Sequence, residues 1–310
     1  MNQPKPYRTY SDFLKEHFAY KVQKLPIDAG FTCPNRDGTK GVGGCVYCNN
    51  QSFNTKYCNR ALSVSEQLRQ GMRFFGGKYE GGKYLAYFQS HSCTYAPLER
   101  LKSLYEEALA VDDVVGIVVA TRPDCVSESL LAYLQRLQRR SFVMLEYGVE
   151  TLNDATLQLI NRCHDAAASV RAIELTHQYG IPQCAHLIFG LPGESVGDML
   201  RTVDLISALP VDVLKFHQLQ VVKGSALERI VAGGCDGVTD KPVKCFALDE
   251  YLALCAEIVG RLSAHVAIER FVSEAPAHML IAPKWGVKPD KFKAMLDRYL
   301  AQHGIFQKKQ

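Results

Sequence analysis

Five short apolar runs from about residue 83 onward, separated by segments of helical periodicity, constrain this sequence more than any other feature, and a sixth strand is expected before them. The run VVGIVVA at 114–120 is apolar without alternation, which is typical of a parallel strand covered on both faces. Between the runs, apolar residues recur at helical spacing, as in Leu98, Leu101 and Leu104. Repeated strand–helix units predict a parallel sheet that right-handed crossovers curl in one direction. The predicted strands are Ala19–Ile27, Tyr84–Phe88, Val114–Ala120, Phe142–Val149, Cys184–Phe189 and Val211–Leu219.

These units indicate an α/β fold. They span about residues 18–235, which is comparable with a barrel or partial barrel of the (β/α) type. An open, doubly wound sheet is compatible with the same pattern. Asn153 and Asp165 each precede a helix-forming segment and are therefore expected to be helix N-caps.

The remainder of the chain predicts an extension of the barrel. Its pattern indicates a helix over Phe246–Leu262, a strand over Val266–Phe271 and a basic helix over Lys288–His303. No proline- or serine-rich linker precedes these elements. We therefore expect a core barrel over 18–235 and a C-terminal α/β extension over 236–310 that packs on it.

Composition narrows the environment of the protein. The N-terminus lacks the apolar core of a secretory signal, and nowhere do eighteen apolar residues follow one another. We therefore expect a soluble, cytoplasmic protein without a membrane partner. In a reducing compartment the eleven cysteines, an odd number, indicate metal binding, catalysis or burial rather than a disulfide framework. The net charge of +4 permits an anionic partner but does not require one.

A cysteine-rich loop directly follows the first predicted strand. It reads CPNRDGTKGVGGCVYC, with eleven residues between Cys33 and Cys45 and two between Cys45 and Cys48. A C-x2-C pair aims two thiolates at one metal centre, and the glycine-rich loop allows Cys33 to fold back toward them. Zinc and an iron–sulfur cluster are both candidates.

The number and place of the ligands bear on this choice. A structural zinc site needs four ligands, and Cys58 could be the fourth in a knuckle like that of a zinc ribbon. Three cysteines on a four-iron cluster instead leave one iron free to coordinate a substrate. The loop begins at the carboxyl end of a strand, where barrels of this type carry their chemistry, and this position favours the cluster.

The loop resembles the cluster loop of radical S-adenosylmethionine (SAM) proteins, in particular the YhcC-like (YtqA-like) group of Fe–S oxidoreductases. Its spacing, C-x11-C-x2-C, fits that group and departs from the C-x3-C-x2-C of most of the superfamily. The resemblance implies a radical SAM partial (β/α)6 TIM-type barrel with a C-terminal extension. Further segments that resemble the family follow in order: FQSHSCTYAPLERL, ATRPDCV, EYGVET, INRCHD, HLIFGLPGES, KFHQLQVVKGS and IERFVSEAP.

The resemblance also implies the chemistry. Cys33, Cys45 and Cys48 would bind three irons of a [4Fe-4S] cluster, and the amino and carboxylate groups of SAM would bind the fourth. An electron from a donor such as flavodoxin or ferredoxin would cleave SAM to methionine and a 5′-deoxyadenosyl radical. This radical would abstract a hydrogen atom from a substrate that the sequence does not identify.

Five residues would contact SAM if the resemblance holds. Tyr47 would lie near the adenine, Glu150 would accept hydrogen bonds from the ammonium or ribose, and Arg162 would hold the carboxylate. Gly190 and Gly193 would bring backbone groups close to the cofactor. Each residue also has an ordinary interpretation: an aromatic shield, a helix-start acid, an exposed helix-end arginine and a strand-to-helix turn.

Other polar residues are expected near the barrel interior. His91, His186 and His217 lie at or near predicted strand ends. A lone histidine is more often a hydrogen-bonded structural residue than a catalyst, so none is assigned a role. Cys93 and Cys184 could line the barrel, but burial explains them equally well.

RNA is one candidate substrate, because related radical SAM enzymes include RNA modifiers; a metabolite is the other. Arg36, Lys40 and the lysines of the tail would form a basic rim, and Trp285 and Tyr299 would add aromatic surface. A solvated charged face explains the same residues without a partner. The tail lysines are Lys284, Lys288, Lys291 and Lys293.

Two other functions remain compatible with the sequence. One is a binding module in which Cys58 completes a structural zinc site, and the other is an iron–sulfur electron carrier that never cleaves SAM. Metal content separates the first of these from the enzyme. Release of 5′-deoxyadenosine separates the second.

Overall fold

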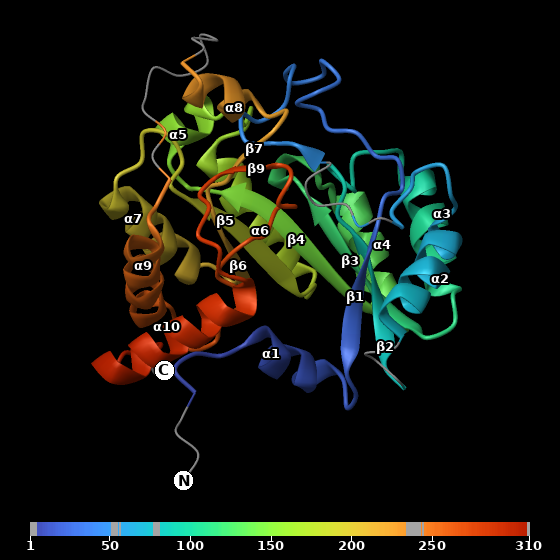
Figure 1. The fold of residues 1–310 in the computed structure, drawn as a ribbon. Coiled ribbons are helices and arrows are strands. Elements are labelled where there is room, and N and C mark those ends of the chain that lie inside the picture. Colours follow the sequence, from blue (N-terminus) through green and yellow to red (C-terminus); the bar gives the residue numbers. More distant parts are fainter. Residues whose placement is uncertain are drawn as a thin grey trace.

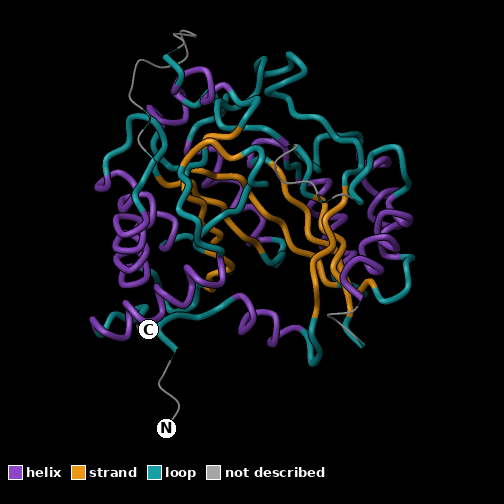
Figure 2. Tube along the Cα trace, in the orientation of Figure 1, coloured by secondary structure: helices purple, strands orange, loops and turns teal. Residues whose placement is uncertain are grey.

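A curled parallel sheet forms the centre of the computed structural model, which describes residues 5–50, 55, 57–76, 81–233, 243 and 245–308. Its strand order is β1-β2-β3-β4-β5-β6-β8, and each neighbouring pair is parallel. Figure 2 shows the strands curving around a central space with helices outside them. The strands are β1 (Val22–Ile27), β2 (Lys83–Phe88), β3 (Val114–Thr121), β4 (Phe142–Glu150), β5 (Gln183–Phe189), β6 (Val213–Gln218) and β8 (Ala267–Arg270).

All six strands predicted in the barrel are present, and their ends agree with the prediction within three residues. The partial α/β barrel is thereby confirmed, and the open doubly wound sheet is excluded because the sheet curls around an interior (Figure 1). The predicted N-caps are also present. The Asn153 side chain accepts hydrogen bonds from the N–H groups of Ala155 and Thr156, and that of Asp165 accepts one from Ala168.

Helices follow the strands along the chain and cover the outer face of the sheet. Helix α3 is typical, because it buries Leu101, Tyr105 and Ala108 and leaves its acidic and basic side chains outside. The helices of this part are α2 (Val64–Phe75), α3 (Leu98–Leu109), α4 (Glu128–Leu137), α5 (Asp154–Leu159), α6 (Ala166–Gln178), α7 (Val196–Ser207) and α8 (Ala226–Val231), with a short 3-10 helix at Pro123–Cys125.

The last third of the chain adds a strand to the sheet. Strand β8, which the sequence assigned to the extension, pairs in parallel with β6 as the seventh strand. Its neighbours are α9 (Leu248–Arg261) and α10 (Pro289–His303), which agree with the predicted helices. The small antiparallel pair β7 (Val221–Val222) and β9 (Leu280–Ala282) is too short for a sequence pattern to reveal. The predicted boundary at 235/236 falls outside the described residues, so the division into core and extension stays a prediction.

The two edge strands of the sheet approach each other. The Nζ atom of Lys24 on β1 lies 2.6 Å from Oε2 of Glu269 on β8. The outer edge of β8 is paired by a single bridge between Thr9 and Ile268. The ion pair therefore links the two edges of the partial barrel, and the bridge covers the edge of β8 with the N-terminal segment.

Helix α1 (Tyr10–His17) closes the amino end of the barrel. Figure 1 shows it below the sheet. Its buried Phe13 packs in one apolar cluster with inward-facing strand residues that include Val118, Met144 and Cys184. The Cys184 side chain is thus part of an apolar layer. Phe13 is held in place by an N-terminal capping box between Thr9 and Asp12.

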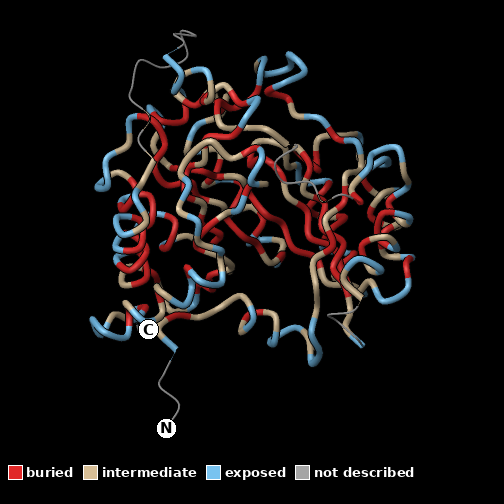
Figure 3. Tube along the Cα trace, in the orientation of Figure 1, coloured by how far each residue is buried: buried red, intermediate tan, exposed pale blue. Residues whose placement is uncertain are grey.

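Burial follows this arrangement. Figure 3 shows buried residues along the strands and exposed residues on the outer helices and loops. Among the described residues, no helix combines the length and the apolar character that a membrane crossing would require.

Candidate active site in the barrel

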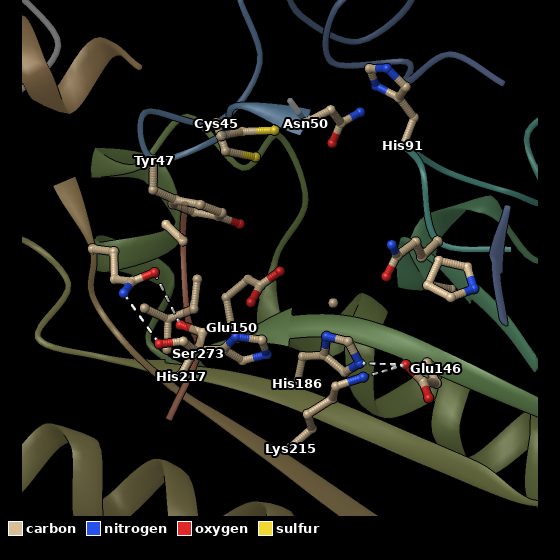
Figure 4. Close-up of a pocket in the computed structure, with 18 of the residues that line it drawn as sticks. Cys45, Tyr47, Asn50, His91, Glu146, Glu150, His186, Lys215, His217 and Ser273 are labelled. Carbon is tan, nitrogen blue, oxygen red and sulfur yellow. Dashed lines mark hydrogen bonds and ion pairs between the residues drawn. The ribbon is translucent and has the colours of Figure 1, made fainter. Parts of the chain in front are cut away.

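A cavity of about 760 Å³ occupies the barrel and extends from the middle of the strands to the cysteine loop. Its volume is typical of a site for a cofactor or small molecule. Six of the eight predicted site residues line it, from β4 and from two separate loops (Figure 4). These six are Cys33, Cys45, Tyr47, Cys48, Glu150 and Arg162.

The cysteine loop is shaped by glycine and anchored by the backbone. Gly44 has φ of +81°, and a Cβ atom there would lie 2.8 Å from Nε of Arg36, so another residue would be strained and crowded. The N–H of Cys48 donates to the carbonyl of Cys45 at 2.9 Å, which closes the C-x2-C turn. The N–H of Val46 donates to the carbonyl of Ile160 at 3.1 Å and fixes the turn above the barrel.

Donors surround the sulfur of Cys45. Nδ2 of Asn35 and Nη1 of Arg162 each lie 3.5 Å from this sulfur. A metal-bound thiolate accepts hydrogen bonds of this kind, and such bonds influence the reduction potential of the metal centre. Burial raises the pKa of the Cys48 thiol, while the guanidinium of Arg36 opposes that shift. The loop thus supplies three thiols, with the positive charge of Arg36 beside that of Cys48.

Cys58 lies outside this group. It does not line the cavity, and its sulfur lies 3.1 Å from the carbonyl oxygen of Pro26 and 2.9 Å from the hydroxyl of Thr55. Burial raises the pKa of its thiol. This placement disfavours Cys58 as the fourth ligand of the zinc interpretation.

The residues predicted to contact SAM face the same space. Nη2 of Arg162 lies 3.6 Å from Oε1 of Glu150 and donates to the carbonyl of Gly148. Burial alone would lower the pKa of Arg162, but Tyr47, Cys45 and Glu150 outweigh it, so the guanidinium stays charged. Glu150 has φ of +68°, a conformation that non-glycine residues rarely adopt and that often marks a functional site.

Among the described residues, several buried polar atoms of side chains that line the cavity lack a hydrogen-bond partner. Buried polar groups in proteins are nearly always hydrogen-bonded, so a cluster of unsatisfied ones indicates a missing polar ligand. Together with the three thiols, these atoms fit a polar cofactor that coordinates a metal centre. They are the hydroxyl of Tyr47, Nδ2 of Asn50, Nη1 of Arg122 and the Nε atoms of Arg162 and Arg270.

The two predicted glycines lie elsewhere. Gly190 and Gly193 have φ of +96° and +81°, as the strand-to-helix turn requires, but neither lines the cavity. A Cβ atom at Gly190 would lie 3.4 Å from the ring of Phe246, so this glycine permits close packing. The structure does not bring the two glycines together with the other six residues, and their contact with a cofactor stays a prediction.

The same turn contains a titratable carboxylate. Burial raises the pKa of Glu194 to about 7, although Thr151 donates a hydrogen bond to it. Because its folded-state pKa exceeds the unfolded value, its contribution to stability is present below pH 4.5 and is lost as the pH rises through 7. We expect Glu194→Gln to remove this loss and to raise the free energy of unfolding at pH 8 by up to about 3 kcal/mol. Urea unfolding of the wild type and of Glu194→Gln between pH 5 and 8 measures this difference in stability. Parallel dependences of stability on pH in the two proteins would contradict a raised pKa at Glu194.

A ring of four charges, which the sequence analysis missed, crosses the barrel below the cysteine loop. Lys215 lies 3.1 Å from Glu146 and 3.0 Å from Glu269, and Lys24 lies 2.5 Å from Glu146 and 2.6 Å from Glu269. Burial alone would raise the pKa of Glu146, but Lys215, Lys24 and His186 hold it well below its ordinary value. The sequence contained a signal for this ring, because Glu146 and Lys215 are charged residues that interrupt apolar strands at inward-facing positions.

Other polar side chains attach to this four-charge ring. The hydroxyl of Tyr87 donates to Glu146 at 2.7 Å, and Nε2 of His186 lies 2.9 Å from the same carboxylate (Figure 4). The donor atoms of Glu146, Cys184 and His186 lie within 4.8 Å of one another, but two ammonium groups already neutralise Glu146. The arrangement is therefore an ion-pair network that supports the cavity floor rather than a second metal site.

The predicted basic rim is wrong as one continuous surface. Helix α10, which carries Lys291 and Lys293, lies near the amino end of the barrel, far from the cysteine loop (Figure 1). Trp285 is half-buried and packs between Tyr251 and Phe292, so it offers little free surface. Arg36 and exposed Lys40 do lie in the cysteine loop, where Lys40 is paired with Asp124.

Two family models match this chain. The model described as the radical SAM superfamily matches residues 33–206, and the model described as the radical SAM C-terminal domain matches residues 211–302. The first match begins at the first cysteine of the loop and ends in α7.

Similar proteins cover almost the whole chain. It is 33% identical over 308 residues to the uncharacterized protein YtqA of Bacillus subtilis, covering 99% of this chain and 94% of YtqA. It is 36% identical to protein YhcC of Escherichia coli, and the match covers 94% of this chain and 91% of YhcC. A tRNA uridine(34) acetyltransferase of Methanocaldococcus infernus is 22% identical over 69% of this chain and 39% of its own length. The solved structure of archaeal Elp3 from the same organism is similar with a TM-score of 0.67 at 16% identity, covering 94% of this chain and 65% of Elp3.

Proposed function

Because this chain belongs to the radical SAM superfamily, whose members bind a [4Fe-4S] cluster and SAM, we propose that it cleaves SAM reductively and abstracts hydrogen from a substrate. The observation that carries this proposal is the set of three cysteines, Cys33, Cys45 and Cys48, on one cavity wall that Cys58 does not share. Three protein ligands leave one iron of such a cluster open. The SAM amino and carboxylate groups would occupy that position.

The chain's own residues define how the bound groups would be held. When bound, the cluster and SAM supply a 5′-deoxyadenosyl radical. Arg162 would orient the SAM carboxylate with its planar guanidinium, and Glu150 would accept hydrogen bonds from the ammonium or ribose. Tyr47 would cover the adenine, and its unpartnered hydroxyl could donate to the cofactor. The walls of the barrel would exclude water from the reacting groups.

We propose an RNA, specifically a tRNA, as the substrate class, and a flavodoxin or ferredoxin as the electron donor. The support for RNA is the similarity to tRNA uridine(34) acetyltransferases, which is distant and covers part of each protein. A nucleotide could enter the barrel if it is turned out of its stack, as enzymes that modify bases require.

Comparison of nucleosides tests the substrate class. Total tRNA from cells with and without the protein is digested, and the modified nucleosides are quantified by mass spectrometry. We expect at least one modified nucleoside to be lost or replaced by its precursor, and to return when the wild-type gene is restored. A Cys45→Ala gene should not restore it. Identical nucleoside profiles together with a changed small-molecule profile would contradict RNA and favour a metabolite.

A substitution at Cys58 tests the ligand set. Because its sulfur points to Pro26 and Thr55 rather than into the cavity, Cys58→Ala should retain about four irons per chain after anaerobic reconstitution. It should also release 5′-deoxyadenosine from SAM under dithionite at a rate within about twofold of wild type. Loss of iron in this variant would indicate a closed four-cysteine site. Retained iron without 5′-deoxyadenosine would indicate an electron carrier.

A further inference from the structure

Arg270 stands apart from the other charged residues of the cavity. It ends β8 on the cavity wall, and its Nε atom is buried without a hydrogen-bond partner. The partner that the structure gives its guanidinium is His217, whose Nδ1 lies 3.1 Å from Nη2. Arg270 thus borders the cavity with a guanidinium whose partner is an imidazole rather than a carboxylate.

Two cationic side chains of the lining, Arg36 and Arg270, have no carboxylate within 4.0 Å among the described residues. Arg36 lies beside the thiols of the cysteine loop, so Arg270 is the unpaired charge away from that loop. Lys24 and Lys215 are balanced by Glu146 and Glu269, and this four-charge ring is neutral as a whole. Elsewhere in the lining, the guanidinium of Arg162 is paired with Glu150, and that of Arg122 is paired with Asp124.

No carboxylate among the described residues lies within 4.0 Å of Arg270. Glu274 also lines the cavity, but it is exposed to solvent.

The neighbouring histidine does not neutralise this charge. Burial lowers the pKa of His217 well below its ordinary value, and Arg270 and His186 lower it further. His217 is therefore neutral near pH 7, with its ring 5.3 Å from that of His186. A neutral imidazole beside the guanidinium can accept from Arg270 or donate to an anion, as its tautomer allows.

Arg270 is also separate from the residues assigned to SAM. Those residues come from the cysteine loop, the end of β4 and the loop after α5, whereas Arg270 and His217 come from β8 and β6. Figure 4 shows His217 across the cavity from Cys45. In the sheet, Arg270 is the register partner of Lys215, at the level of the four-charge ring.

Resting on the proposed function, we propose that Arg270 and His217 bind an oxyanion of the substrate, a carboxylate or a phosphate. The planar fork of arginine suits either group through two parallel hydrogen bonds. The anion would lie on the opposite wall from the cluster and thereby orient the substrate toward it. The substrate would thus be acidic at the part that enters the barrel.

Chemical modification of the native protein tests this site. The reconstituted holoenzyme, with SAM bound, is treated with the arginine reagent phenylglyoxal in Tris-chloride, and adducts are quantified by peptide mass spectrometry. Acetate and inorganic phosphate are the probes. The exposed Arg201, with a side-chain exposure of 72%, is the control. At an anion concentration ten times its dissociation constant, modification of Arg270 should slow about tenfold, and that of Arg201 should not change.

The outcomes separate the possible ligands. Protection by acetate alone supports a carboxylate, and protection by phosphate alone supports a phosphate. Equal rates in acetate, phosphate and chloride overturn the proposal, and so does an Arg270 that SAM alone makes unreactive, because it then belongs to the cofactor site. Iron content and 5′-deoxyadenosine release, measured on the same preparation, show separately whether the proposed function holds.

Discussion

Alanine in place of Cys45 should leave the purified protein nearly free of iron. The wild type should hold about four irons per chain after anaerobic reconstitution, because a [4Fe-4S] cluster needs all three of its protein ligands here. Cys45 is buried at the cavity wall, and its sulfur accepts from Asn35 and Arg162. Its removal therefore leaves donors with no acceptor as well as an iron with no ligand. Cys33→Ala and Cys48→Ala should have the same effect.

The measurement combines iron analysis, visible absorbance and product release. All three variants should lose the brown absorbance of the cluster, and their 5′-deoxyadenosine should fall to the level seen without protein. Cys58→Ala is the matched control, since it removes a half-buried thiol that does not line the cavity. Undiminished absorbance in any of the three variants, or one tightly bound zinc in the wild type, would be incompatible with the proposed cluster.

Truncation of Glu146 should have the largest effect on stability. Glu146 is fully buried and accepts from Lys24, Lys215 and Tyr87. Glu146→Ala leaves two ammonium groups in the barrel with half of their countercharge, and removal of one partner from a buried ion pair costs about 3–5 kcal/mol. The midpoint of urea unfolding should fall accordingly.

The exposed ion pair between Glu257 and Arg261 provides the control for this experiment. Glu257→Ala removes a carboxylate of the same kind from the surface of α9 and should change stability by less than about 1 kcal/mol. The pH profile gives a second readout. Because the folded-state pKa of Glu146 is lowered, its contribution is present above the unfolded value of about 4.3 and is lost as the pH falls. Equal losses of stability in Glu146→Ala and Glu257→Ala would contradict a network role.

Local pattern was sufficient to predict most of the fold. Strands β2 to β6 are mostly apolar runs that are buried on both faces, and Asn153 and Asp165 cap helices through contacts with residues two or three positions away. Such features depend on near neighbours in the sequence. The spacing of the three cysteines was equally local, and the structure places all three on one cavity wall.

The contacts that span the barrel could not be predicted in this way. Lys24 meets Glu269 across 245 positions, and Arg270 meets His217 across 53. The first pair depends on the curl of the sheet, which brings the first and last strands together, and the second depends on the pairing of β8 with β6. Cys58 shows the converse, since it is near Cys48 in sequence yet points to Pro26 on β1. Closeness in sequence therefore did not predict closeness in space, because the loop after Cys48 directs the Cys58 side chain away from the other cysteines.

The ion pair between Lys24 on β1 and Glu269 on β8 links the two edges of the partial barrel. All other neighbouring strands of the sheet share a ladder of backbone hydrogen bonds. Separating two of those strands would break many backbone hydrogen bonds at once. Between the two edge strands, the structure gives the ion pair between Lys24 and Glu269, while the bridge between Thr9 and Ile268 joins β8 to the segment before α1. Opening the partial barrel along this line would therefore break an ion pair rather than a ladder of backbone hydrogen bonds.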